Sequence, residues 1–143
     1  MARNFFSRNK LVKIADHAAA NTTAVTSSIV DTAGYQGVVF LTSLSTANAT
    51  NTIKVQQNTA NQTTGMSDLE GTSVTSGSSD EDLIVEVAQP QERYLQVVVT
   101  RGASTTCESI WALLYNGDAG IAASVVTGTS AGELHVAPDE GTA

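Results

Sequence analysis

The side chains that could carry out chemistry are sparse in this chain, and the densest group of them is acidic. Residues 78–82, Ser-Ser-Asp-Glu-Asp, place three carboxylates together, and hard cations such as Ca²⁺ bind clustered carboxylates. The run lacks the alternating Asp-x-Asp-x-Asp-Gly spacing of a calcium loop, so a solvated turn is favoured over a cation site at residues 80–82. His17 and His135 are isolated, without metal-ligand spacing to another His or Cys. We therefore expect neither a metal site nor a cofactor.

Cys107 is the single cysteine of the chain, so it cannot form an internal disulfide. No His lies near it in the sequence, and we interpret it as a small strand residue instead of a nucleophile. Ser, His and acidic residues do not occur in a known catalytic pattern, and no Gly-rich phosphate loop is present. We therefore expect that the protein is not an enzyme.

The first ten residues combine aromatic and basic side chains. Arg3, Arg8 and Lys10 are three of the seven Lys and Arg residues, and Phe5 and Phe6 stand between them. An exposed pair of Phe side chains is costly in water, so these residues are candidates for a partner-binding arm. In that hypothesis the two rings anchor in a pocket of the partner and the cations meet an acidic surface. The alternative is a disordered terminus.

Composition excludes several classes of partner. The chain has a formal net charge of −7 and only 15% charged residues, which argues against nucleic acid because phosphate binding needs a basic surface. No apolar run approaches the roughly 18 residues of a membrane span, so we expect no membrane partner. We also expect no secretory signal, since the apolar run at Phe5 and Phe6 is too short. The length of 143 residues fits one domain.

The stretch that organises the chain is residues 92–101, Glu-Arg-Tyr-Leu-Gln-Val-Val-Val-Thr-Arg, just after a proline. Proline cannot donate to a sheet, so the strand should begin after it. Alternate residues of a strand share a face, and one face of this strand is fully apolar. That face consists of Leu95, Val97 and Val99. The pattern predicts a central strand, with Arg93 and Arg101 at its ends reaching water or an acidic partner.

The remaining chain predicts an all-β protein. Period-2 patterns between turn residues indicate strands, and residues 16–20 could form one helical turn at most. The expected strands lie within 11–14, 21–31, 38–44, 52–57, 83–87, 92–101 and 108–115, with a further short strand near 69–74. A jelly-roll-like antiparallel β-sandwich of about eight strands, with extended N- and C-terminal arms, fits this count. The predicted parts are an N-terminal arm (1–10), a β-sandwich domain (11–116) and an extended C-terminal segment (117–143).

Several turn and strand patterns of the chain form a set, together with its acidic Gly-Thr ending. They are Asp31-x-x-Gly34-Tyr35-x-Gly37-Val38-Val39-Phe40, Gln89-Pro90-x-x-Arg93-Tyr94-Leu95 with Arg101, Ile110-x-x-Leu113-Leu114-Tyr115, and Pro138-Asp139-Glu140-Gly141-Thr142. This set resembles a family of small virion proteins of tailed bacteriophages, the capsid decoration or cement proteins of jelly-roll type. The resemblance covers roughly residues 11 to 143.

The resemblance implies a structural protein on the outer surface of the phage head. Its partner would be the major capsid protein, whose neighbouring subunits it would clamp from outside, and it would form a homo-oligomer, a dimer or a trimer. A neck, tail or head-fibre component is the alternative within the same class. A carbohydrate-binding β-sandwich is the alternative from another class, but it needs exposed aromatic residues, and we expect Trp111 and Tyr115 to be packed.

Overall fold

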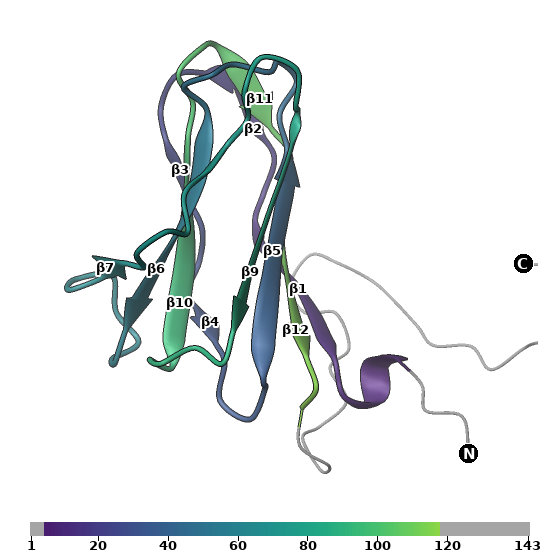
Figure 1. Cartoon of the computed structure of the whole chain (residues 1–143), viewed down its shortest axis with the longest axis vertical. Coiled ribbons are helices and arrows are strands. Elements are labelled where there is room, and N and C mark those ends of the chain that lie inside the picture. The colour runs from purple at the N-terminus through teal and green to yellow at the C-terminus, as the bar shows by residue number, and fades with distance from the viewer. Residues whose placement is uncertain (1–4, 118–143) are drawn as a thin grey trace, which may run out of the picture.

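The computed structural model of the chain describes residues 5–117, which form two facing layers of antiparallel strands (Figure 1). Of the predicted segments, residues 1–4 and 118–143 lie outside the described part. The elements are η1 (Phe5–Ser7), β1 (Lys10–Ala15), β2 (Ala18–Asn21), β3 (Val25–Thr26), β4 (Val30–Asp31), β5 (Gly37–Ser43), β6 (Thr52–Asn58), β7 (Ser67–Asp68), β8 (Val74–Thr75), β9 (Asp82–Ala88), β10 (Tyr94–Thr100), β11 (Thr105–Cys107) and β12 (Ile110–Tyr115).

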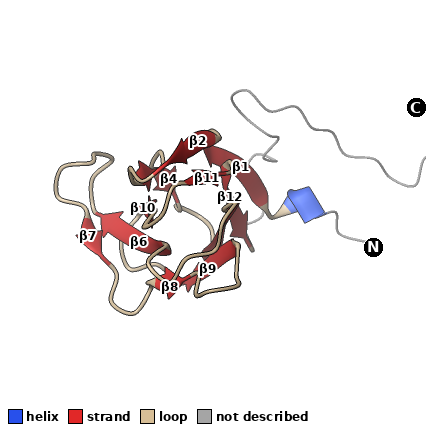
Figure 2. Cartoon of the chain, turned by 90° about the horizontal axis from the view of Figure 1, so that it is seen from above, coloured by secondary structure: helices blue, strands red, loops and turns tan. Residues whose placement is uncertain are grey.

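The first layer is a four-stranded sheet in the order β1-β12-β5-β9. The second layer has the order β3-β10-β6-β7, with β4 pairing β10 and β8 pairing β6, and a small sheet of β11 and β2 lies at one end. The chain passes directly from one layer to the other between β4 and β5, β5 and β6, β8 and β9, and β9 and β10. Seen from above, β1 and β12 lie on one side of the molecule and β6 and β7 on the other (Figure 2). The predicted all-β antiparallel sandwich is therefore confirmed, whereas the jelly-roll topology stays a prediction.

The core lies between the two layers and is almost entirely aliphatic. Alternate residues of the strands point into this core and are removed from water. Burial of apolar surface is the main favourable contribution to the free energy of folding, at roughly 25 cal/mol per Å² of apolar area. Phe40 is the one aromatic side chain among the buried core residues. The others that are less than 2% exposed include Val38, Ile53, Val55, Leu83, Leu95, Val97, Val99, Ile110, Ala112 and Leu114.

β10 is the central strand of its layer, as the sequence predicts. It pairs with β6 along its whole length and with β3 and β4 on the other side. The single strand expected within 21–31 is two short strands, β3 and β4, and the buried Ser27 lies between them. Ser27 still pairs with β10: its N–H donates to the Val97 carbonyl oxygen at 3.0 Å, and its Oγ accepts a hydrogen bond from the Val97 N–H at 3.0 Å.

Arg101 differs from its predicted role at the end of this strand. It is only 5% exposed, so it reaches neither water nor an acidic partner. Its guanidinium donates instead to the backbone oxygens of Thr23 and Ala19 at 2.7 Å and of Thr105 at 2.8 Å. A buried cation needs hydrogen bonds in place of water, and three carbonyl groups supply them here. Arg101 thereby joins the small sheet of β2 and β11 to the end of the sandwich.

Two other expectations need correction. The sequence predicts at most a helical turn at residues 16–20, but Ala18–Asn21 is the strand β2, paired with β11.

The short strand expected near residues 69–74 is present only at its last residue, because Val74 begins β8. Residues 69–73 connect β7 to β8 through a turn, in which Gly71 has a φ of +76°. Its two ends, β7 and β8, both pair with β6, so the turn returns the chain to the same strand. Small polar residues, many of low strand propensity, are frequent in residues 58–82, so the sequence did not show where its short strands begin and end.

Candidate interaction surfaces

The aromatic residues of the predicted arm form a short turn at one end of the sandwich. Phe5 and Phe6 lie in η1 and contact each other edge to face, with ring centroids 5.2 Å apart and planes at 85°. Phe5 is 52% exposed, and Arg8 beside it is exposed as well. Edge-to-face pairs are favourable for the ring quadrupoles. The turn therefore presents a large apolar side chain and a cation to solvent together, while Arg3 lies outside the described residues.

Backbone contacts attach this turn to the end of β12. The carbonyl oxygen of Arg8 accepts a hydrogen bond from Gly117 N at 2.6 Å, and Asn9 Oδ1 accepts one from Asn116 N at 3.0 Å. Asn9 Nδ2 in turn donates to the carbonyl oxygen of Phe5 at 2.8 Å. The aromatic turn is thus held against the rigid body at residues 8 and 9.

Lys10, which the sequence assigns to the arm, is the first residue of β1 and pairs with Leu114. It contributes to the electrostatics of Asp31 instead. The pKa of Asp31 lies below its ordinary value, chiefly because Arg93 donates to its two carboxylate oxygens at 2.7 and 2.8 Å, with Lys10 a smaller cause. The structure therefore brings Phe5, Phe6 and Arg8 together and leaves Lys10 in the sandwich.

A second candidate surface is the outer face of the four-stranded sheet. Residues that are paired across a sheet point to the same side, so the register places the outward side chains in rows. One row runs Lys13, Trp111, Leu41 and Ile84, and the next runs Leu11, Leu113, Val39 and Glu86. We call its six apolar members the apolar face: Leu11, Val39, Leu41, Ile84, Trp111 and Leu113.

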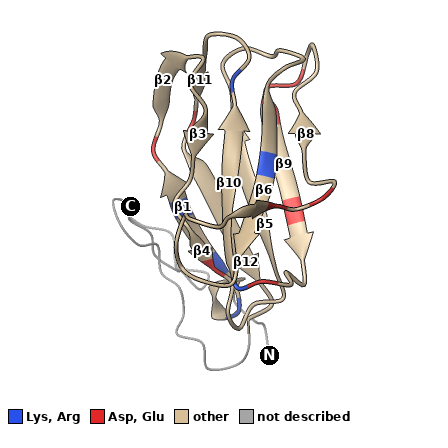
Figure 3. Ribbon diagram, turned by 90° about the vertical axis from the view of Figure 1, so that its left-hand side faces the viewer, with Lys and Arg blue, Asp and Glu red and all other residues tan. Residues whose placement is uncertain are grey.

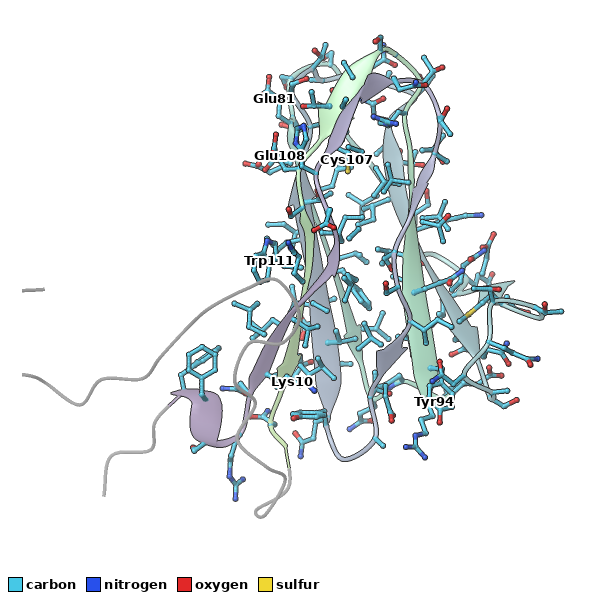
Figure 4. The ribbon with its side chains drawn as sticks, turned by 180° about the vertical axis from the view of Figure 1, so that it is seen from behind. Lys10, Glu81, Tyr94, Cys107, Glu108 and Trp111 are labelled. Carbon is cyan, nitrogen blue, oxygen red and sulfur yellow. The ribbon has the colours of Figure 1, made fainter. Side chains whose placement is uncertain are left out.

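The apolar face is not fully covered within the described residues. Ile84 is 59% exposed and Leu41 is 37% exposed, and the other four members are half-buried. Trp111 points away from the body on the side where η1 projects (Figure 4). Contiguous apolar groups with a polar rim are typical of surfaces that bind another molecule.

The opposite outer face, on β6 and β10, is polar. Its cross-strand pairs include Gln96 with Gln56 and Thr100 with Thr52, and Gln96 Nε2 donates to Gln56 Oε1 at 2.7 Å. Lys54 forms an ion pair with Asp68 at 2.8 Å on the same side. Figure 3, which views this layer, shows that charged residues are few on its strands. One outer face is therefore suited to water, whereas the other exposes apolar groups.

Tyr115 closes one end of the apolar face by crossing a neighbouring strand. A Cβ atom added at Gly37 of β5 would lie 2.2 Å from the Tyr115 hydroxyl oxygen, so the ring lies directly over this glycine. The hydroxyl donates a hydrogen bond to Glu86 Oε1 on β9. This hydrogen bond raises the pKa of Tyr115 above its ordinary value. Gly37 is thus required for the close approach of the ring to the strand.

A shallow hollow lies beside Trp111 at the other end of the apolar face. It has a volume of about 340 Å³ and is lined by Leu41, Thr42, Ser43, Glu108, Ser109 and Trp111.

The expectation that the Trp111 and Tyr115 side chains are packed against other residues was wrong in part. Both side chains lie on the outer side of β12 and are half-buried, while Ile110, Ala112 and Leu114 fill the core.

Cys107 is fully buried at the end of β11. Burial raises the pKa of its thiol, which disfavours the reactive thiolate. Thr42 Oγ1 lies 3.6 Å from the sulfur, between the layers (Figure 4). The interpretation of Cys107 as a structural strand residue therefore agrees with its surroundings.

The titratable residues singled out in the sequence, including those at 80–82, are not arranged as a metal site in the described part of the chain. His17 Nδ1 lies 3.2 Å from Glu108 Oε2, and this pair is exposed. Among residues 5–117, no group of three His, Cys, Asp or Glu side chains is placed to hold a metal ion. His135 lies outside these residues.

No helix among residues 5–117 has the length and apolar character needed to cross a membrane.

Sequence reasoning missed the apolar face, although its signal was visible. Residues 38–44 are apolar on both faces, and Trp111 and Leu113 share the second face of their strand. A strand that is apolar on both faces predicts that both of its faces are covered by other parts of the protein, and here one of them is not.

In comparisons with known proteins, no family model matches this chain and no curated protein gives a significant match.

Proposed function

We propose that this protein is a structural component of a virion, a capsid decoration or cement protein that binds the outside of a tailed-phage head. In this role it stabilises contacts between neighbouring major capsid protein subunits. The observation that carries the proposal is the turn of Phe5 and Phe6 at one end of the sandwich, in which Phe5 is exposed and Arg8 lies beside it. The resemblance of the turn and strand patterns to those of such proteins supports the same role.

The physical requirements of a cement protein are modest. It needs a rigid body and complementary contacts, and weak contacts to several subunits gain strength through effective concentration. Aromatic anchors beside a cation are groups that dominate many protein interfaces. The net charge of −7 favours a place outside the shell, away from the packaged genome. No catalytic step belongs to this role.

The experiment that tests the proposal is thermal release of packaged DNA from heads with and without the protein. A ligand that binds only the assembled shell stabilises that shell by mass action, so heads lacking the protein should release DNA at a lower temperature. Adding the purified protein should restore the higher temperature in a saturable way. Identical release curves would contradict the proposal. Immunogold labelling found only on tails or necks would favour a neck, tail or head-fibre component.

A carbohydrate-binding module is the second candidate, and Trp111 is the observation that favours it. Its half-buried side chain lines the hollow together with Glu108, and sugar sites commonly combine an aromatic face with polar groups. Because Trp111 is the single tryptophan, its fluorescence reports directly on this hollow. A saturable change on titration with oligosaccharides would support this candidate, whereas an unchanged spectrum across a panel of glycans would remove it.

A further inference from the structure

We propose that Asn116, which precedes Gly117, is a modification site that deamidates through a succinimide when the aromatic turn leaves the end of β12. The aromatic turn consists of residues 5–9, that is η1 with Arg8 and Asn9. This inference goes beyond the proposed function, because it concerns a covalent change in the free protein and involves no capsid. It rests on the one Asn-Gly pair of the sequence and on the contacts that hold this pair in place.

The reaction needs only the Asn116–Gly117 peptide and water. The Gly117 nitrogen loses its proton and attacks Asn116 Cγ, so an N–Cγ bond forms, the Cγ–Nδ2 bond breaks, and the amide group takes up a proton and leaves as ammonia. Water then opens the imide ring. Cleavage of the new N–Cγ bond gives aspartate, whereas cleavage of the bond to the backbone carbonyl carbon gives isoaspartate. Glycine has no Cβ atom to hinder the attack, and Asn116 is exposed to water.

The aromatic turn holds the nitrogen atom that must attack. Gly117 N donates to the carbonyl oxygen of Arg8 at 2.6 Å, and Asn116 N donates to Asn9 Oδ1 at 3.0 Å. Gly117 is buried, and a Cβ atom added there would lie 3.0 Å from both the Arg8 oxygen and the Tyr35 ring. The Gly117 N–H is therefore shielded from hydroxide and keeps its proton while the turn is in place.

The backbone of Asn116 also prevents ring closure. Its φ is +53°, in the left-handed region, where ψ is about +47°. At that ψ the Gly117 nitrogen and the Asn116 Cβ atom lie on opposite sides of the Cα–C bond, whereas the imide ring needs them on the same side. The Gly117 peptide must therefore rotate before it reacts. Rotation breaks the hydrogen bond to Arg8, so the reaction requires a local opening in which the turn undocks.

Deamidation would prevent the aromatic turn from returning to its place. Isoaspartate adds one carbon atom to the backbone, so the two N–H groups no longer match the spacing of their two acceptors in the turn. Either product also lacks Asn116 Nδ2, which donates to Gln36 Oε1 at 3.3 Å, and introduces a carboxylate. The reaction thus converts a transient opening into a lasting release of the turn.

Peptide mapping by mass spectrometry measures the rate of deamidation in the full chain at mildly alkaline pH. With a synthetic peptide of residues 112–120 as the reference, Asn116 in the full chain should react at least about tenfold more slowly, because only the open fraction reacts. Asn9→Ala removes the acceptor of the Asn116 N–H and should raise the full-chain rate about threefold or more. Asn61→Ala, in the exposed loop after β6, is the matched control and should leave the rate unchanged.

Three results would overturn the proposal. They are an unreactive peptide, equal rates in the peptide and the full chain, and equal rates in the natural sequence and Asn9→Ala. Circular dichroism of each variant verifies that the compared proteins are folded.

Trypsin cleavage after Arg8 tests the release of the turn. Ion exchange separates the deamidated chain by its additional negative charge. This form should be cleaved after Arg8 about tenfold faster or more than the natural form, since cleavage follows the population of the open state. Equal cleavage of the two forms would show that the turn stays docked after deamidation, and it would overturn the proposed release.

Discussion

At the scale of single residues, the structure is controlled by a few side chains that cross from one strand to another. Tyr115 reaches from β12 over Gly37 of β5 to Glu86 of β9. Arg101 donates to three backbone carbonyl groups, and two of them, those of Ala19 and Thr23, belong to a segment far from it in the sequence. Such contacts join separate strands through side chains, and they fix the position of one strand relative to the next.

Gly37→Ala should destabilise the fold by about 1–3 kcal/mol, because the added methyl group would displace the Tyr115 ring. Urea denaturation measures the change in the free energy of unfolding. In a Tyr115→Ala background the same substitution should cost much less, since the ring is gone. An equal cost in both backgrounds would show that the ring does not lie over Gly37.

The Tyr115 hydrogen bond also predicts a loss of stability at high pH. The pKa of Tyr115 is raised from its ordinary value of 10.0, so its contribution is fully present below pH 10 and is lost as pH rises through the folded-state pKa. The contribution should be about 1 kcal/mol or less, because the pair is near solvent. Urea unfolding of the natural sequence and of Tyr115→Phe should differ at pH 8 and converge at strongly alkaline pH. A constant difference would contradict this role.

At the scale of elements, β10 is the strand on which its layer depends. It pairs with β6 on one side and with β3 and β4 on the other, and its inward row is fully buried. The rest of that layer is built from strands that contact β10 or β6. Damage to β10 should therefore spread through the whole layer.

Val97→Asp should prevent folding to a soluble protein. Val97 is 0% exposed and pairs with Val55, and an unpaired buried charge costs about 3 kcal/mol or more. Thr100→Asp, at the exposed end of the same strand, is the matched control and should fold normally. Circular dichroism with thermal melting of the soluble fraction distinguishes the two. A cooperative melt of the Val97→Asp variant would show that β10 is not central.

At the scale of the whole molecule, the sandwich is a rigid body with two different surfaces for contact. The aromatic turn projects from one end, whereas the apolar face covers one side of a layer. In the proposed function the turn binds the capsid. The turn and the apolar face consist of different residues, so a substitution in one of them leaves the side chains of the other in place.

Deletion of residues 1–7 should separate capsid binding from stability. It retains Arg8 and Asn9, which hold the end of β12, so Tm should change by less than about 4 °C, the shift of roughly 1 kcal/mol. Binding to heads in co-sedimentation should weaken about tenfold or more, because the aromatic anchors are lost. The variant with Phe5→Ser and Phe6→Ser keeps the cations and should weaken binding similarly. Unchanged binding by both variants would remove the arm hypothesis.

The sequence by itself determined the long strands and the rows that fill the core. Side-chain alternation is a local property, so the pattern of Leu95, Val97 and Val99 was sufficient to predict a central strand with one buried face. Alternation also grouped Ile110, Ala112 and Leu114 on one face of their strand, but only the structure shows that this face is the buried one. In segments without this alternation, such as residues 16–20 and 58–82, the sequence did not show which residues form strands and which form turns.

Only the tertiary structure decided which outward residues lie together. The row of Lys13, Trp111, Leu41 and Ile84 comes from four strands, and its members meet because of strand order and register. Register is set by pairing between distant segments, and a slip of one residue would turn each strand's side chains to the other face. Arg101 illustrates the same limit, because its carbonyl partners lie on other strands and loops. A local pattern shows that a residue points outward, but it does not show what lies beside it.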